Sequence, residues 1–142
     1  DRYISLLSRR LEIMGRYDET CDELGISHLV HHTTEERDGV EMDSSNHLYL
    51  IRVPGIGEEE RNQIITMMAE AGVATNVHYK PLQMMSGYKR LGYKIEDYPN
   101  CYDYYRNLIT LPFHTLLSDE DVEYVVESLK TIITEMKKSG EI

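Results

Sequence analysis

The sequence predicts an α/β fold of the α+β kind, in which one small three-stranded sheet is packed by helices mainly on one face. Three short β-prone segments, at 47–53, 73–79 and 108–111, alternate with segments whose apolar residues recur at three- and four-residue steps. The chain has 142 residues, which is the length of one domain with one hydrophobic core. Alternating elements of this kind bury their apolar faces by forming a layer of helices on a layer of strands.

A first helix is expected over residues 2–24. Its apolar positions Ile4, Leu7 and Leu11 form one stripe, and Gly25 is typical of a residue that ends a helix. The next stretch, 26–46, is rich in His, Thr, Glu and Asp and shows no period. It therefore predicts a long loop with at most one short strand.

The second helix is expected between two strands. The segment 47–53 is mostly apolar and ends at Pro54, as a buried strand would. Residues 58–60 are all Glu, and acids in a first helical turn interact favourably with the helix dipole. The β-prone segment 73–79 predicts the next strand, which must finish before Pro81 because proline cannot donate a ladder hydrogen bond.

The rest of the chain predicts two short helices, near 85–91 and 99–107, then the strand 108–111 and a long closing helix. Ser118 followed by Asp121 has the form of a helix-capping box. The residues after it repeat with helical period at Val122, Val125, Val126, Leu129, Ile132, Ile133 and Met136.

Composition excludes several classes of function. A net charge of −10 argues against a nucleic-acid surface, and the longest apolar runs are too short to span a membrane. Two cysteines without ligand spacing indicate neither disulfides nor zinc, which fits a reducing, cytoplasmic setting. The chain opens on Asp1 without an initiator methionine, and we therefore expect it to be one part of a longer protein.

Three groups of residues could be interpreted as functional sites, but a structural role is better supported for each of them. His31 and His32 with Glu35 and Glu36 carry metal-binding groups, but neighbours in a polar loop seldom converge on one ion, so we expect a solvated loop and no metal. Neither cysteine, at 21 or 101, has a base nearby in sequence, and both are expected to pack in the core. The helically spaced tyrosines are likewise expected on one packed face: Tyr98, Tyr102 and Tyr105.

The segment 76–83 is the best candidate for a site. It places Asn76, His78, Tyr79 and Gln83 where a strand gives way to a turn, and a rigid sheet can present such groups to a ligand. From the residues alone, a ligand site and a purely structural turn are equally supported.

A series of motifs in a fixed order resembles the C-terminal end of the DegT/DnrJ/EryC1/StrS aminotransferase family. The motifs cover nearly the whole chain and lie at Gly72–Leu82, Tyr88–Tyr93, Asp97–Asn100, Thr110–Pro112 and Leu117–Val122. Upstream, Ser8–Tyr17 is similar to the helix that joins the two domains of that family, and His47–Arg52 to the strand after it.

The resemblance implies a homodimeric fold-type-I enzyme that uses pyridoxal phosphate to move an amino group from glutamate to a keto-deoxy-sugar linked to a nucleotide. Residues 1–142 would be its C-terminal small domain, with 1–24 as the interdomain helix and 25–142 as the body. The large domain, with the lysine that holds the cofactor, would precede Asp1. The chain itself would then contain no catalytic, cofactor-binding or metal-binding residue.

The family's small domain closes one side of the sugar site, and the resemblance implies His78, Tyr79, Gln83 and Asn76 as residues of the pocket wall. Many relatives have a second histidine where this chain has Gln83, whose neutral amide can orient a hydroxyl but cannot transfer a proton near pH 7. Two alternatives stay open: a pyridoxal-phosphate-dependent sugar dehydratase of the same family, and a stand-alone interaction or ligand-binding module.

Overall fold

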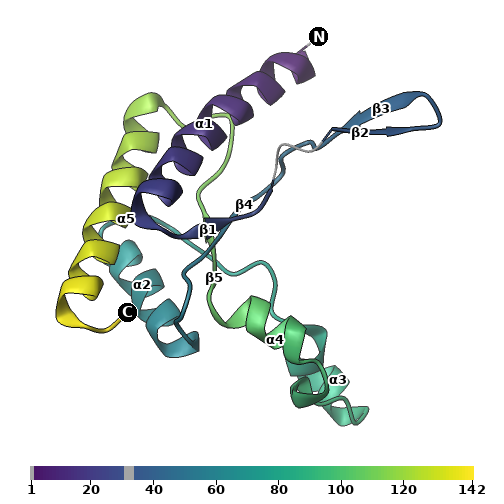
Figure 1. Ribbon diagram of the computed structural model, residues 1–142, viewed down its shortest axis with the longest axis vertical. Coiled ribbons are helices and arrows are strands. Elements are labelled where there is room, and N and C mark those ends of the chain that lie inside the picture. Colours follow the sequence, from purple (N-terminus) through teal and green to yellow (C-terminus); the bar gives the residue numbers. More distant parts are fainter. Residues whose placement is uncertain (1, 31–33) are drawn as a thin grey trace.

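The computed structural model describes residues 2–30 and 34–142, and Figure 1 shows its arrangement. Five α-helices, two short 3-10 helices and five strands follow one another along these residues. Their bounds are α1 Arg2–Leu24, β1 Ser27–His28, β2 Thr34–Arg37, β3 Val40–Asp43, β4 Tyr49–Arg52, α2 Glu58–Glu70, η1 Leu82–Met84, α3 Ser86–Arg90, η2 Ile95–Asp97, α4 Pro99–Arg106, β5 Leu108–Leu111 and α5 Asp119–Ser139.

A three-stranded antiparallel sheet lies at the centre of the molecule, in the order β1-β4-β5. Ile51 of β4 stands opposite Ile109 of β5, and neither is exposed to solvent. Burying each such side chain stabilises the fold by roughly 1.5–3 kcal/mol. The predicted fold class, helices with one small three-stranded sheet, is therefore confirmed.

Three helices cover the sheet, and Figure 1 shows α1, α2 and α5 gathered on one side of it. Along α5 the residues expected from the helical period are the buried ones, among them Val126, Leu129 and Ile133. The predicted capping box is present, because the Ser118 side chain accepts a hydrogen bond from the Asp121 N–H at 3.1 Å and Asp121 bonds the Ser118 N–H in return. Gly140 ends this helix in the left-handed conformation with φ of 78°.

The expected strand over 73–79 is wrong. Only Asn76 pairs with β5, through an isolated bridge to Thr110. One residue later, the Val77 N–H donates to the side-chain oxygen of Asn76 at 2.8 Å, so it does not extend the ladder. The third strand of the sheet is instead β1, on the opposite edge beside β4.

The expectation of a long loop with at most one short strand over 26–46 is also wrong. This region contributes β1 and the two strands of a hairpin, β2 and β3, which pair with each other in register from Thr34 opposite Asp43 to Arg37 opposite Val40. Gly39 and Asp38 at its tip have positive φ values of 76° and 54°, as a tight hairpin turn requires. The histidines considered as metal ligands, His31 and His32, lie outside the described residues.

The two cysteines have different environments. Cys21 is fully buried in the core, as expected, whereas Cys101 is exposed on α4, so its expected packing role is wrong. Burial raises the pKa of the Cys21 thiol to about 11, because a thiolate loses its hydration inside the core.

This difference predicts selective alkylation. At pH 8, below the raised pKa of Cys21, its thiol is almost entirely protonated and lacks the reactive thiolate. We expect iodoacetamide to label Cys101 in the native protein and to label Cys21 only after unfolding in urea, as measured by mass spectrometry of the peptides. Equal labelling of both cysteines in the native protein would contradict the buried position of Cys21.

Candidate rim and cavity beside the sheet

The segment Asn76–Gln83, called the rim segment below, is anchored to the edge of the sheet by its first residue. The Asn76 N–H donates to the Thr110 carbonyl at 3.1 Å, and the Thr110 N–H donates to the Asn76 carbonyl at 2.7 Å. Thr110 belongs to β5 and is buried, so its position is set by the core. The start of the rim segment therefore has a rigid support.

Thr110 also holds the side chain of His78. Its Oγ1 lies 3.0 Å from Nδ1 of the half-buried imidazole, and either group can be the donor according to the tautomer of the ring. Among the described residues, none bonds the other ring nitrogen, Nε2. Fixing Nδ1 in this way orients the ring and leaves Nε2 able to bind a ligand.

The remaining predicted site residues lie on the outer part of the rim segment. The Tyr79 side chain is 69% exposed and its ring meets the His78 ring edge-to-face, with 4.7 Å between the centroids. Gln83 is half-buried on η1. The structure thus brings Asn76, His78 and Tyr79 together at one edge of the sheet, whereas no hydrogen bond within the described chain joins Gln83 to them.

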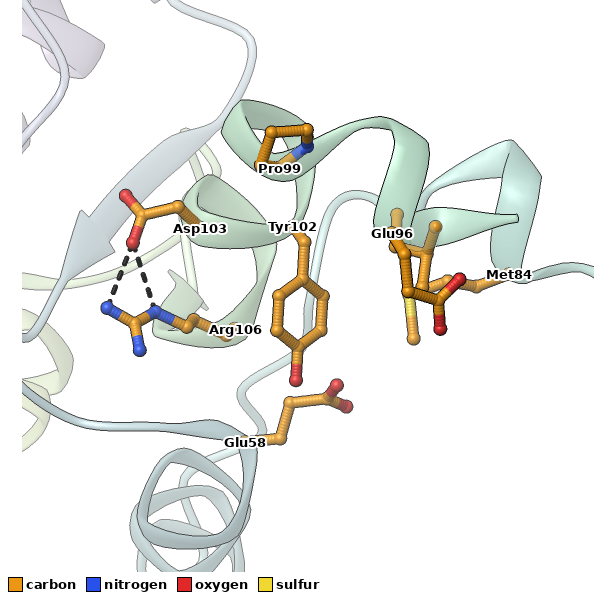
Figure 2. A pocket seen from close by; sticks show the side chains of 8 residues that line it. Glu58, Met84, Glu96, Pro99, Tyr102, Asp103 and Arg106 are labelled. Carbon is orange, nitrogen blue, oxygen red and sulfur yellow. Dashed lines mark hydrogen bonds and ion pairs between the residues drawn. The ribbon is translucent and has the colours of Figure 1, made fainter. Parts of the chain in front are cut away.

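A separate cavity of about 650 Å³ lies between α4 and the start of α2, and Figure 2 shows it. None of the four predicted site residues lines it. Its lining combines a largely apolar floor with three carboxylates and one guanidinium, from Glu58, Met84, Ile95, Glu96, Pro99, Tyr102, Asp103 and Arg106. It adjoins the rim segment along the chain, because Met84 follows Gln83 on η1.

A buried arginine sets one wall of this cavity. Arg61 is 1% exposed, and its guanidinium lies over the Tyr105 ring and donates to the Leu108 carbonyl at 3.4 Å. It also pairs with Glu58 at 3.4 Å. The Glu58 carboxylate in turn accepts a hydrogen bond from the Tyr102 hydroxyl and raises the pKa of Tyr102, because that bond favours the protonated phenol. Figure 2 shows this hydroxyl pointing towards Glu58.

The opposite wall is held by Asp103. Its carboxylate pairs with Arg106 at 2.9 Å and with Arg52 of β4 at 3.0 Å. These guanidinium groups, Arg52 first, lower the pKa of Asp103, because they favour its ionised form. The carboxylates at 58 and 103 are therefore already paired, and the cavity presents no activated nucleophile among the residues that line it.

Two features of this region were missed by sequence reasoning. Thr110 was noticed only as part of the motif Thr110–Pro112, and nothing in the sequence indicated its contact with the rim segment, because that contact depends on a bridge between residues 34 positions apart in the chain. Tyr102 was expected on a packed face with Tyr98 and Tyr105, but only Tyr105 is buried. The i,i+3 pair of Asp103 and Arg106 on one short helix was the available signal for an exposed, charged face there.

Two kinds of feature are absent from the part of the chain that the structure describes. Within residues 2–30 and 34–142, no group of three or more His, Cys, Asp or Glu side chains has a geometry that could hold a metal ion. Over the same residues, every helix is too short or too polar to cross a lipid bilayer.

Residues 2–130 match the sequence profile of one family, described as the DegT/DnrJ/EryC1/StrS aminotransferase family. The chain belongs to this family. The match spans the core sheet, the rim segment, the cavity and most of α5. The resemblance identified from the ordered motifs is therefore confirmed.

Solved structures agree with this assignment. A protein described as a sugar aminotransferase from Streptococcus pneumoniae, in its apo form, aligns over 100% of this chain with 45% identity and a TM-score of 0.88. Its pyridoxal-phosphate form aligns over 95% of the chain with a TM-score of 0.85. The fold of this family member is thus that of a segment of a sugar aminotransferase.

Curated relatives are more distant in sequence. The spore coat polysaccharide biosynthesis protein SpsC of Bacillus subtilis is 30% identical over 93% of this chain. A UDP-4-amino-4,6-dideoxy-N-acetyl-β-L-altrosamine transaminase of Campylobacter jejuni is 30% identical over 67% of it. The chain spans about a third of the length of SpsC and a quarter of the length of the transaminase.

The hydrogen bond between the side chains of Thr110 and His78 can be tested by mutation in this family member. Thr110→Val keeps the shape of the side chain but removes Oγ1, and we expect the free energy of unfolding to fall by about 1 kcal/mol. The ¹⁵N shifts of the His78 ring should also change, as NMR would measure, because Nδ1 loses its partner. Thr134→Val on the exposed face of α5 is the matched control and should alter neither quantity. An unchanged His78 spectrum in the first variant would refute the assigned bond.

Proposed function

We propose that this chain is the C-terminal small domain of an aminotransferase that transfers an amino group from glutamate to a nucleotide-linked keto-deoxy-sugar through pyridoxal phosphate. Residues 1–24 are the interdomain helix and 25–142 the body. The observation that supports this most directly is the match over residues 2–130 to an aminotransferase family, together with 45% identity to the streptococcal protein. The transaminase from Campylobacter supplies the substrate class by analogy.

The cofactor belongs to another part of the enzyme in this proposal. Pyridoxal phosphate needs a lysine amine for its Schiff base in an enclosed site. The lysines here do not fit that role. Lys130 pairs with Glu23, Lys137 donates to the Leu24 carbonyl, and Lys80, Lys89, Lys94 and Lys138 are exposed. We therefore assign no catalytic or cofactor-binding residue to this chain and derive no step through the cofactor.

The rim segment forms one wall of the sugar pocket in the proposed enzyme. His78 presents Nε2, Tyr79 its hydroxyl and Gln83 its amide, and these polar groups suit the hydroxyl and acetamido groups of a sugar. Asn76 contributes to the wall by anchoring the segment to the sheet through its peptide groups. Holding His78 by Thr110 limits the freedom that the ring would lose on binding. The wall positions substrate; it does not carry out the proton transfer between carbons.

The proposal includes the setting of the enzyme. It acts as a homodimer in the cytoplasm, with glutamate and a nucleotide sugar as its substrates, and with neither nucleic acid nor membrane as a partner. The net charge of −10 supports the exclusion of nucleic acid, because a polyanion would be repelled. The relative in Bacillus subtilis, a polysaccharide biosynthesis protein, supports a product used in building glycans.

The full-length enzyme tests the function directly. Incubated with glutamate and a series of nucleotide-linked keto-deoxy-sugars, it should release 2-oxoglutarate with at least one of them. In that reaction, His78→Ala should lower kcat/KM for the sugar roughly tenfold or more, because a hydrogen bond to the substrate is lost. The exposed His114 provides the matched control variant, His114→Ala, which should leave kcat/KM unchanged.

Other outcomes of this experiment have a clear meaning. Release of 2-oxoglutarate with none of the sugars would contradict the proposed function. Loss of water from the sugar without consumption of glutamate would instead indicate the dehydratase. An unchanged kcat/KM in His78→Ala would show that the rim segment does not line the sugar pocket. It would not contradict the proposed reaction.

A further inference from the structure

Two arginines from different elements hold the turn that joins α4 to β5. Arg61 reaches this turn from α2, and Arg52 reaches it from β4. The carbonyl groups in the last turn of a helix lack partners within the helix, and the negative end of the helix dipole lies there, so a guanidinium is favourable at this place. Arg52 and Arg61 are together called the arginine clamp below.

Arg52 binds the turn from the side of the sheet. Its Nε donates to the side-chain oxygen of Asn107 at 2.8 Å, and its Nη2 donates to the Asp103 carbonyl at 2.8 Å. Asn107 is buried, and its carbonyl accepts a hydrogen bond from the Val53 N–H at 3.3 Å. A guanidinium can bind both acceptors at once because its donors are fixed in one plane, whereas a lysine ammonium cannot.

Arg61 binds the same turn from the interior. Its Nη1 donates to the Tyr105 carbonyl at 3.5 Å and to the Leu108 carbonyl at 3.4 Å, and the guanidinium lies over the Tyr105 ring. Withdrawing a charge from water is costly, and apolar residues in such a position often give equal or greater stability. The buried guanidinium is therefore better explained by the geometry that it fixes than by a gain in stability.

The arginine clamp lies next to the anchor of the rim segment. Leu108 and Thr110 are two residues apart in β5, so their carbonyls point to the same edge of the strand, about 7 Å from each other. Arg61 binds the Leu108 carbonyl at that edge, and the Asn76 N–H binds the Thr110 carbonyl. Thr110 also bonds the ring of His78. A displacement of the turn would therefore pass along β5 to the residue that orients His78.

We propose that Arg52 and Arg61 are positioning residues for the sugar pocket: by fixing the turn between α4 and β5, they fix Thr110 and, through it, the imidazole of His78. Neither arginine contacts the sugar in this proposal, because both act through β5. The expected effect on the sugar rests on the proposed function, whereas the expected effect on His78 concerns this chain alone.

Conservative variants of the clamp test the effect on His78. Arg52→Lys and Arg61→Lys keep the positive charge but lose the planar set of donors. The 142-residue chain has its own hydrophobic core, and NMR of this chain measures the ¹⁵N resonances of the His78 ring. We expect each variant to shift the resonances that Thr110→Val also shifts.

Arg16→Lys is the matched control. Arg16 donates two hydrogen bonds to the Glu123 carboxylate of α5, and its side chain is 27% exposed, close to the 25% of Arg52. The control therefore removes a comparable set of bonds at a place that is not connected to β5. We expect it to leave the His78 resonances unchanged.

The full-length enzyme tests the effect on the sugar. Arg52→Lys and Arg61→Lys should each raise KM for the nucleotide sugar roughly fivefold and change kcat less, because a displaced His78 weakens binding of the sugar and takes no part in the proton transfer. Arg16→Lys should leave KM unchanged. Circular dichroism of each variant checks that it is folded at the temperature of the assay.

The outcomes that would overturn the proposal are distinct from a failure of the proposed function. Unchanged His78 resonances in both clamp variants, or an equal shift in Arg16→Lys, would overturn it. So would an unchanged KM in clamp variants whose His78 resonances have shifted. Should Arg61→Lys not fold, Arg52→Lys decides the test, since Arg52 is only half-buried. A full-length enzyme that releases no 2-oxoglutarate would contradict the proposed function, and the His78 resonances would still decide whether the clamp orients this ring.

Discussion

Burial of the central strands beneath three helices is the constraint on which the rest of the structure depends. Tyr49, Ile51 and Ile109 have no exposed surface, and the long helix α5 supplies the apolar side chains that share their core. Deleting buried groups of this size from a packed core costs several kcal/mol. The sheet can therefore serve as a fixed frame for the polar residues at its edge.

Thr110 connects this frame to the candidate site. Its backbone pairs with β4 on one side and with Asn76 on the other, while its hydroxyl bonds the His78 ring. One buried residue thus sets both the path of the rim segment and the orientation of its imidazole. The neighbouring cavity is organised in a similar way, because Arg61 lies in the interior and directs Glu58, which in turn bonds Tyr102. In both places, a polar group on the surface is positioned by a residue in the core.

Sequence periodicity predicted most of the elements, and its two failures have physical causes. Helices α1, α2 and α5 were predictable because their apolar stripes and end residues are local signals. The segment 73–79 is β-prone, yet Asn76 bonds its own neighbour Val77 and the ladder stops after one bridge. The hairpin of residues 34–43 was hidden because β2 has no apolar residue and β3 has only two, Val40 and Met42, which are too few to show a clear strand period.

The sequence by itself determined the family, the fold class and the cluster of polar residues between Asn76 and Gln83, since motif order, periodicity and residue type can be read along the chain. Tertiary structure alone decided which strand completes the sheet, that Thr110 orients His78, and that a cavity lies beside Tyr102. The reason is physical: these properties depend on contacts between residues distant in the chain, and no local pattern encodes such pairings.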